Sequence, residues 1–207
     1  NVTPAIERLG IPTYDWWNEA LHGVARAGRA TVFPQAIAMA ATFDDNAVHE
    51  TFTMVSDEAR AKYHQYQKDK EYDRYKGLTF WTPNINIFRD PRWGRGMETY
   101  GEDPYLTEKM GVAVTRGLQG DDPNYYKTHA CAKHYAVHSG PEWNRHEFDV
   151  EATPRDLYET YLPAFEALVK EGDVQEVMCA YNRFEGKPCC SSDKLLIDIL
   201  RNSWGYD

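Results

Sequence analysis

Eight residues of the sequence could together bind a polyhydroxylated molecule. Each lies where a β-prone run or a polar loop offers side chains able to hydrogen-bond: Glu19, His22, Arg95, Lys133, His134, Arg145, Met178 and Tyr181. Arginine and lysine donate to hydroxyl groups, a carboxylate accepts from two of them, and aromatic side chains cover a ring face. The set holds several cations and a single carboxylate, Glu19, so we expect a cation-rich pocket that fits a polyol ring.

Each of these residues also has a structural interpretation when taken alone. An isolated histidine such as His134 is more often structural, and Arg95 could equally clamp its loop by pairing with Glu98 or Glu102. Lys133 and His134 are adjacent, so on a regular strand they point to opposite faces. In an open sheet one of them would face the core, which is unfavourable for an unpartnered lysine. At the end of a barrel strand both can turn into a polar mouth.

The elements that must position these side chains alternate along the chain. Four β-prone runs are separated by helical patterns: 11–15, 78–87, 128–138 and 174–182. Alternation of this kind indicates βαβ units and a parallel sheet. The carboxyl ends of the runs carry the polar residues, which is where barrel and doubly wound enzymes place their chemistry. No glycine-rich phosphate fingerprint follows the first run, which disfavours the nucleotide-binding version.

We therefore predict an α/β fold of the TIM-type (β/α) barrel class, with residues 1–207 forming part of one barrel domain. Four strands are fewer than a barrel's eight, so we expect an incomplete barrel whose last strands are missing. The helices between the strands have clear start signals. Asp44 or Asp45 begins a helix to about Gln67, and the remaining starts are Phe33-Pro34, Asp103-Pro104, Thr153-Pro154 and Ser192. Glycines 117 and 120 are expected to end the helix that begins at Asp103.

Composition excludes several classes of protein. The chain has 207 residues, 42% of them hydrophobic, and a net charge of −9, which is globular and argues against a general nucleic-acid binder. No apolar run approaches the ~20 residues of a membrane span, and no signal peptide is recognisable. The absence of a CxxC pair makes a zinc knuckle unlikely, and we expect no metal and no cofactor. Aromatic residues make up 14%, which suits a carbohydrate or peptide groove, although most should belong to the core.

The four cysteines leave alternatives open. Cys131 and Cys179 lie in apolar strand-like runs and should behave as small buried hydrophobes. Cys189 and Cys190 are adjacent, and they could form a vicinal disulfide or remain as two free thiols.

Four segments resemble glycoside hydrolase family 3. They are Asn84–Pro104 (NINIFRDPRWGRGMETYGEDP), Ala132-Lys-His-Tyr135, Val177-Met-Cys-Ala-Tyr-Asn182 and Leu200-Arg-Asn-Ser-Trp-Gly-Tyr206. The resemblance covers nearly the whole chain and implies the N-terminal barrel domain of a retaining, exo-acting β-glycosidase. It implies sugar-binding roles for Arg95, Lys133, His134 and Arg145, and a subsite lining for Met178 and Tyr181. It also implies a periplasmic or extracellular location.

The resemblance further points to the substrate and to the catalytic groups. Glu19 lies three residues before His22-Gly23, where the family's glucosidases usually carry aspartate, and its longer side chain would fill the space of a hexose hydroxymethyl group. With Trp16-Trp17 and Phe80-Trp81, this resembles the xylosidase branch, so the expected ligand is a xylo-oligosaccharide or, failing that, a gluco-oligosaccharide. The family's nucleophile is an aspartate just after the Trp-Gly-Tyr segment, so we expect it beyond Asp207.

The family's acid/base carboxylate comes from a later domain, so we expect no catalytic carboxylate within these 207 residues. The expected partners are the missing strands and a further domain of the same enzyme. Two other functions remain open: a sugar-binding domain without catalysis, and a barrel aldolase that uses Lys133 as a Schiff base. The aldolase would need a desolvated lysine, which we do not expect beside His134 and the arginines.

Overall fold

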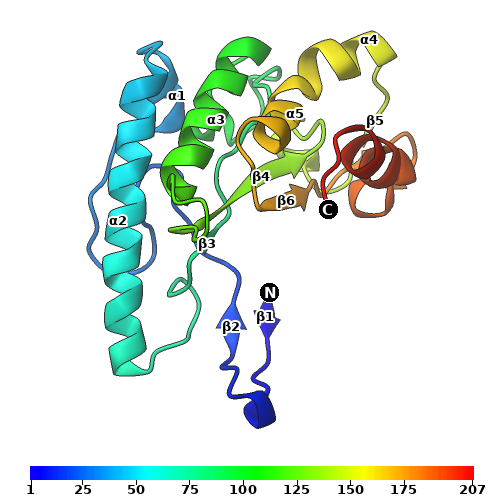
Figure 1. Ribbon diagram of the computed structural model, residues 1–207. Helices are drawn as coiled ribbons and strands as arrows, with labels where there is room; N and C mark the ends of the chain where they lie inside the picture. The colour runs from blue at the N-terminus through cyan, green and yellow to red at the C-terminus, as the bar shows by residue number, and fades with distance from the viewer.

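A parallel three-stranded sheet forms the centre of the computed structural model, which describes residues 1–207. Its strands are β3 (Thr79–Phe80), β4 (His129–Tyr135) and β6 (Glu176–Cys179), in the order β3-β4-β6. Helices α2 (Asp45–Asp69), α3 (Pro104–Gln119) and α5 (Pro163–Lys170) lie together on one side of this sheet (Figure 1). Each parallel pair is joined through a helix, so the predicted α/β class with βαβ units is confirmed.

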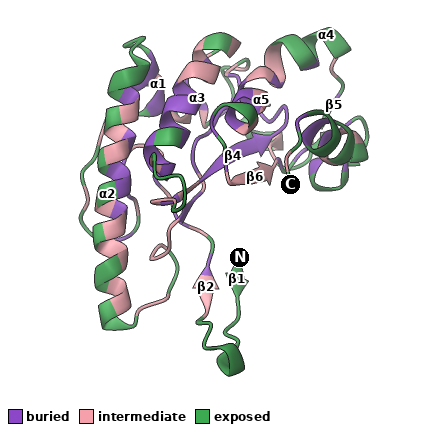
Figure 2. Ribbon diagram, viewed as in Figure 1, coloured by how far each residue is buried: buried purple, intermediate pink, exposed green.

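The long helix α2 begins and packs as its sequence indicates. The side chain of Asp44 accepts a hydrogen bond from the backbone nitrogen of Ala47 at 2.9 Å, which caps the helix. Its apolar stripe is buried against α3, as the alternating purple and green along α2 in Figure 2 shows. Gly117 was predicted to end α3 but lies inside the helix. A glycine is needed there because a Cβ would come within 2.7 Å of the carbonyl oxygen of His49 in α2. The helix ends before Gly120, whose φ is 76°.

The remaining helices follow their predicted starts with local irregularities. Asp103 caps α3 through Leu106, and Thr153 caps α4 (Pro154–Asp156), which continues as the π-helical turn η4 (Leu157–Tyr161) into α5. The other helical segments are short or π-helical: η1 (Glu7–Leu9), α1 (Ala36–Ala40), η2 (Gly96–Glu98), η3 (Glu142–Asn144), η5 (Cys189–Ser191) and η6 (Lys194–Ser203). No helix has the length and apolar character needed to cross a bilayer.

The first predicted strand, 11–15, does not join the central sheet. Its last two residues form β2 (Tyr14–Asp15), which pairs antiparallel with β1 (Val2–Thr3). This hairpin projects from the body and is largely exposed (Figures 1 and 2). The chain meets the sheet later, at Asn18, which forms a parallel bridge with Phe80. The residue types in so short a run indicate a β-strand but not the strand with which it pairs. The prediction that it belongs to the parallel sheet was therefore wrong.

The second predicted strand, 78–87, is also shorter than expected. Regular pairing stops after Phe80, and one isolated bridge between Asn84 and Lys133 follows. Pro83 lies between these two points and has no N–H group to donate to a neighbouring strand. A separate small sheet, β5 (Asp149–Val150), β7 (Arg183–Phe184) and β8 (Lys187–Pro188), lies beyond the carboxyl end of β6.

The disulfide differs from both alternatives for the cysteine pair. Cys179 is bonded to Cys190, with the Cα atoms 5.3 Å apart, whereas Cys131 and Cys189 are buried free thiols. The β7–β8 turn folds the chain back so that Cys190 reaches the end of β6. The neighbouring Cys189 instead faces the core, near the carbonyl of Ala136. The expectation of a small buried hydrophobe is therefore confirmed for Cys131 and wrong for Cys179, which is bonded and only partly buried.

Candidate functional site

A cavity of about 450 Å³ opens at the carboxyl ends of β4 and β6. All seven residues predicted to bind substrate line it: Glu19, Arg95, Lys133, His134, Arg145, Met178 and Tyr181. His22 lines it as well, with its Nδ1 atom 2.9 Å from the carbonyl oxygen of Phe33. The sequence did not assign the other lining residues a place there: Trp17, Leu21, Gly23, Ala25, Arg26, Trp81, Glu98 and His146. The fold thus gathers residues that are up to 164 positions apart, from Trp17 to Tyr181.

A bulge in β4 brings Lys133 and His134 to the same cavity. Lys133 pairs with Met178, and the next register pair joins Tyr135 to Cys179, so His134 has no residue opposite it. An extra residue of this kind breaks the alternation of side chains along a strand. The two side chains therefore share one polar cavity, as expected for a strand end that opens into a mouth, and do not point to opposite faces as on a regular strand.

Lys133 is buried and faces a carboxylate. Only 2% of the residue is exposed, and its Nζ atom lies 3.6 Å from Oε2 of Glu19. Burial lowers the pKa of Lys133, while the Glu19 carboxylate opposes that shift. The other Glu19 oxygen, Oε1, accepts a hydrogen bond from Nε1 of Trp17 at 2.8 Å. The expectation that Lys133 is not desolvated was wrong, because the body of the domain covers it and Glu19 supplies the compensating charge.

Both ring nitrogens of His134 are occupied. Arg95 Nη1 lies 3.1 Å from Nε2, and because arginine can only donate, Nε2 is the acceptor. The proton is then on Nδ1, which donates to Oδ1 of Asn86 at 3.0 Å. Asn86 also accepts from the backbone nitrogen of His134 and donates to its carbonyl oxygen, at 2.9 Å each. Burial and the nearby Lys133 hold the pKa of His134 well below its usual range, so the ring is neutral.

A second carboxylate, Glu98, lies in the cavity and binds Arg95. Arg95 donates from Nε to Oε1 of Glu98 at 2.9 Å and from Nη2 to Oε2 at 2.5 Å. Burial is the largest single influence and raises the pKa of Glu98, but the hydrogen bonds and charge of Arg95, together with the charge of Lys133, outweigh it, so the pKa is lowered. Arg95 therefore clamps its loop through Glu98, as one interpretation predicted, and it also lines the cavity. The prediction of a single carboxylate was wrong, although the three-residue spacing of Arg95 and Glu98 was the available signal.

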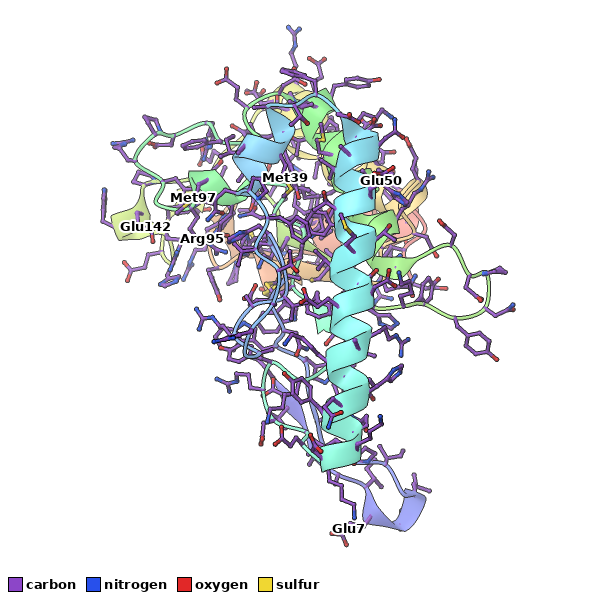
Figure 3. All side chains as sticks on the ribbon, turned by 90° about the vertical axis from the view of Figure 1, so that its left-hand side faces the viewer. Glu7, Met39, Glu50, Arg95, Met97 and Glu142 are labelled. Atoms are coloured by element: carbon purple, nitrogen blue, oxygen red, sulfur yellow. A yellow bond between two sulfur atoms is a disulfide. The ribbon has the colours of Figure 1, made fainter.

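Aromatic rings and a second arginine form the rest of the wall. Trp17 and Trp81 stack with centroids 5.5 Å apart and planes 13° apart. On the other side, Tyr181 is 59% exposed and packs edge-on against His146 at 4.9 Å. Nη1 of Arg145 is paired with Glu142 at 2.9 Å. Figure 3 shows Arg95, Met97 and Glu142 on one side of α2, far from Glu7 in the hairpin.

The cavity combines charged donors, charged acceptors and flat apolar faces in one space. Its arrangement suits a small polyol, because hydroxyl groups can donate to Glu19 while Lys133 and the arginines donate to hydroxyl oxygens. No group of three or more histidine, cysteine, aspartate or glutamate side chains is placed to hold a metal ion.

Comparisons with known proteins give a consistent result. The model described as "Glycosyl hydrolase family 3 N terminal domain" matches residues 3–207. A xylan 1,4-beta-xylosidase of Xylanibacter ruminicola is 54% identical over 99% of this chain and 24% of its own length. Probable beta-D-xylosidase 7 of Arabidopsis thaliana is 43% identical over 100% of this chain and 29% of its own length. The chain thus spans about a quarter of the length of these curated relatives.

Solved structures agree with the sequence relatives. A GH3 exo-beta-xylosidase in complex with a xylobiose aziridine probe superposes with a TM-score of 0.88 at 37% identity, covering 98% of this chain and 27% of that one. A GH3 beta-glucosidase of Bifidobacterium adolescentis superposes with a TM-score of 0.83 at 29% identity, covering 100% of this chain and 28% of that one.

Proposed function

The chain belongs to glycosyl hydrolase family 3, and from this premise we propose that it forms the terminal-sugar subsite of an exo-acting, retaining β-xylosidase. The observation that carries the proposal is the convergence of seven residues from five separate segments on one cavity of about 450 Å³. The similarity to proteins named xylosidases supports it.

The three parallel strands are, in this proposal, consecutive strands of a (β/α) barrel. Their sequential order, the helices on one side and the cavity at the carboxyl ends all support this architecture. The barrel would be completed by polypeptide outside these 207 residues, in keeping with relatives about four times as long.

Each side chain then has a defined task toward the terminal sugar. Lys133 and Arg145 donate hydrogen bonds to hydroxyl oxygens, and Glu19 accepts from hydroxyl groups. Met178 and Tyr181 cover the ring. His134 acts mainly through Arg95, because its Nε2 lone pair already accepts from that guanidinium and fixes its direction.

The covalent chemistry needs carboxyl groups that this cavity does not offer in free form. A retaining glycosidase uses two carboxyl groups about 5–5.5 Å apart, one as nucleophile and one as acid and base. Glu19 is paired with Lys133, and Glu98 with Arg95, so both are engaged in holding cations. We therefore propose that the nucleophile and the acid/base residue come from polypeptide beyond Asp207, and that Lys133 helps to keep the nucleophile ionised.

Xylose is the preferred terminal sugar in this proposal. Glu19 is held in place by Trp17 Nε1, and Trp17 is stacked on Trp81, which together leave a stiff wall beside the ring. A hexose would have to place its hydroxymethyl group against that wall, whereas a pentose has none.

The test is the substitution Glu19→Asp in the active protein. Removing one methylene should raise the ratio of kcat/KM for an aryl β-glucoside over an aryl β-xyloside, by about tenfold for a change of this size. Glu50→Asp, an exposed change on α2, is the matched control and should leave the ratio at its parental value. A ratio that Glu19→Asp does not move would contradict the assignment of Glu19 to sugar selection.

A second candidate function is sugar binding without hydrolysis by these 207 residues alone. The pairing of both cavity carboxylates with cations favours it. Calorimetry with xylose, together with an aryl xyloside assay on the isolated chain, separates the two: binding without turnover supports this description. The aldolase alternative gains from the burial of Lys133, but it has no support from the family, and borohydride trapping with a carbonyl substrate would reveal it.

A further inference from the structure

Arg26 is the one lysine or arginine of the cavity lining that has no carboxylate partner. The other three are paired: Arg95 with Glu98, Lys133 with Glu19, and Arg145 with Glu142. Arg26 forms no ion pair, and it is exposed where the others are at least partly buried.

Aromatic contacts hold Arg26 at the end of a row of rings. Its guanidinium lies 5.5 Å from the centroid of the Tyr75 ring, and Nη1 lies 3.3 Å from the tyrosine hydroxyl. Tyr75 packs edge-on against Trp17 at 5.7 Å, and Trp17 stacks on Trp81. The row therefore leads from the partly buried Glu19, along aromatic side chains, to an exposed arginine.

The backbone at Arg26 is unusual for a residue with a side chain. Its φ is 60°, in the left-handed region that favours glycine, and glycines occupy that region nearby at Gly23 and Gly28. A left-handed residue with a Cβ costs about 1–2 kcal/mol. Such outliers cluster at ligand-binding sites, where the surrounding structure holds them in place. The loop thus keeps an arginine where a glycine would be less strained.

Building on the proposed function, we infer that Arg26 binds the carboxylate of an acidic oligosaccharide. The terminal xylose occupies the buried subsite, the next sugar lies along the Trp17–Trp81 wall, and a uronic acid substituent on that sugar meets Arg26. An arginine fork matches a carboxylate with two parallel hydrogen bonds, which no neutral sugar offers. Arg26 would therefore select acidic xylo-oligosaccharides over neutral ones of the same length.

The experiment compares binding of a uronic-acid-substituted xylo-oligosaccharide with that of the neutral oligosaccharide of the same backbone. Calorimetry on the parent protein should give tighter binding of the acidic ligand by about fivefold, the size expected for one exposed ion pair. Arg26→Gln should bring the ratio close to one, and Arg26→Lys should restore part of it. Raising the salt concentration should shrink the parental ratio, because exposed charges are screened.

Arg29→Gln is the matched control, since Arg29 is an exposed arginine of the same loop that does not line the cavity. It removes the same charge and should leave the acidic-to-neutral ratio unchanged. Equal weakening of both ligands by Arg26→Gln would overturn the inference, because it would assign Arg26 to neutral hydroxyl groups. A parental ratio of one would overturn it as well.

The same proteins separate this inference from the proposed function. Loss of the ratio in Arg26→Gln together with turnover of an aryl xyloside supports both. Loss of the ratio in a protein that also carries the polypeptide beyond Asp207, but shows no glycosidase activity, supports the acidic-ligand site and contradicts the proposed hydrolysis.

Discussion

Two glutamate residues near the β4–β6 ladder have pKa values shifted in opposite directions, although both are at least partly buried. At the start of the ladder, Cys131 of β4 pairs with Glu176 of β6, and burial raises the pKa of Glu176 to about 7. The buried Oε1 atom of Glu176 has no hydrogen-bond partner. Two residues further along, Lys133 pairs with Met178, and there the neighbouring Glu98 has a lowered pKa although it is also largely buried.

The difference lies in the neighbours of each carboxyl group. Glu98 receives two hydrogen bonds from Arg95 and lies in the field of Lys133, so its charged form is favoured. Glu176 lies opposite Cys131, which supplies no positive charge, so desolvation is the one influence on its pKa. Burial without a cationic partner favours the neutral carboxyl of Glu176. At the cavity, the opposite charges of Arg95 and Lys133 keep the carboxyl of Glu98 ionised.

Removing the central cation should give the largest effect. Lys133→Met leaves Glu19 partly buried beside Arg95 without its direct partner, and it deletes the proposed donor to the sugar. We expect kcat/KM for an aryl β-xyloside to fall by about 100-fold or more, the range seen when one member of a buried charge pair is removed.

Lys68→Met provides the control, because Lys68 is exposed on α2 and forms no ion pair. Parental activity in Lys133→Met would show that the cavity charges are not part of the sugar site. The contrast between the two ends of the ladder would then have no functional meaning.

Removing the side chain of Asn86, an uncharged partner of His134, should give an effect of intermediate size, seen in the free energy of unfolding. Asn86 exchanges hydrogen bonds with the backbone and the ring of His134 and is 3% exposed, so Asn86→Ala leaves buried polar groups without partners. We expect the free energy of unfolding to fall by about 2 kcal/mol, measured by denaturant titration. The exposed Asn46→Ala should change it by less than about 0.5 kcal/mol, and equal effects of both variants would argue against a rigid network.

Neutralising Glu176, which has no cationic partner, should give the smallest change in the free energy of unfolding, and this change should depend on pH. Between its ordinary pKa of 4.5 and its folded value of about 7, Glu176 binds more protons in the folded state. Stability from this group is therefore present below pH 4.5 and is lost as the pH rises through about 7. Glu176→Gln stays neutral, so its free energy of unfolding should gain on the parent by about 1–2 kcal/mol between pH 5 and pH 8.

The comparison must use the difference between variant and parent at each pH. Buried His138, whose pKa falls to about 4 mainly through desolvation, contributes the opposite slope, because its stabilisation is lost as the pH falls. Glu151→Gln, an exposed change with no ion pair, is the control and should show no pH-dependent gain. A flat difference for Glu176→Gln would mean that Glu176 is charged in the folded protein and has found a partner.

The sequence by itself determined most helix starts, the βαβ alternation and many of the residues that line the cavity. Helix starts at Asp44, Asp103 and Thr153 depend on local capping, which acts over three residues and is readable from spacing. All seven residues predicted to bind substrate line one cavity, although the strand that precedes Glu19 pairs outside the central sheet.

Only the tertiary structure decided which of these residues form hydrogen bonds, ion pairs or a disulfide with one another. The bulge at His134, the tautomer set by Arg95 and Asn86, and the Cys179–Cys190 bond each join positions whose proximity depends on strand register. The same is true of the missing partner of Glu176 and of the free guanidinium of Arg26. Periodicity reports whether a residue is buried, but electrostatic partnership depends on distances between segments far apart in the chain, and those are fixed only when the layers pack.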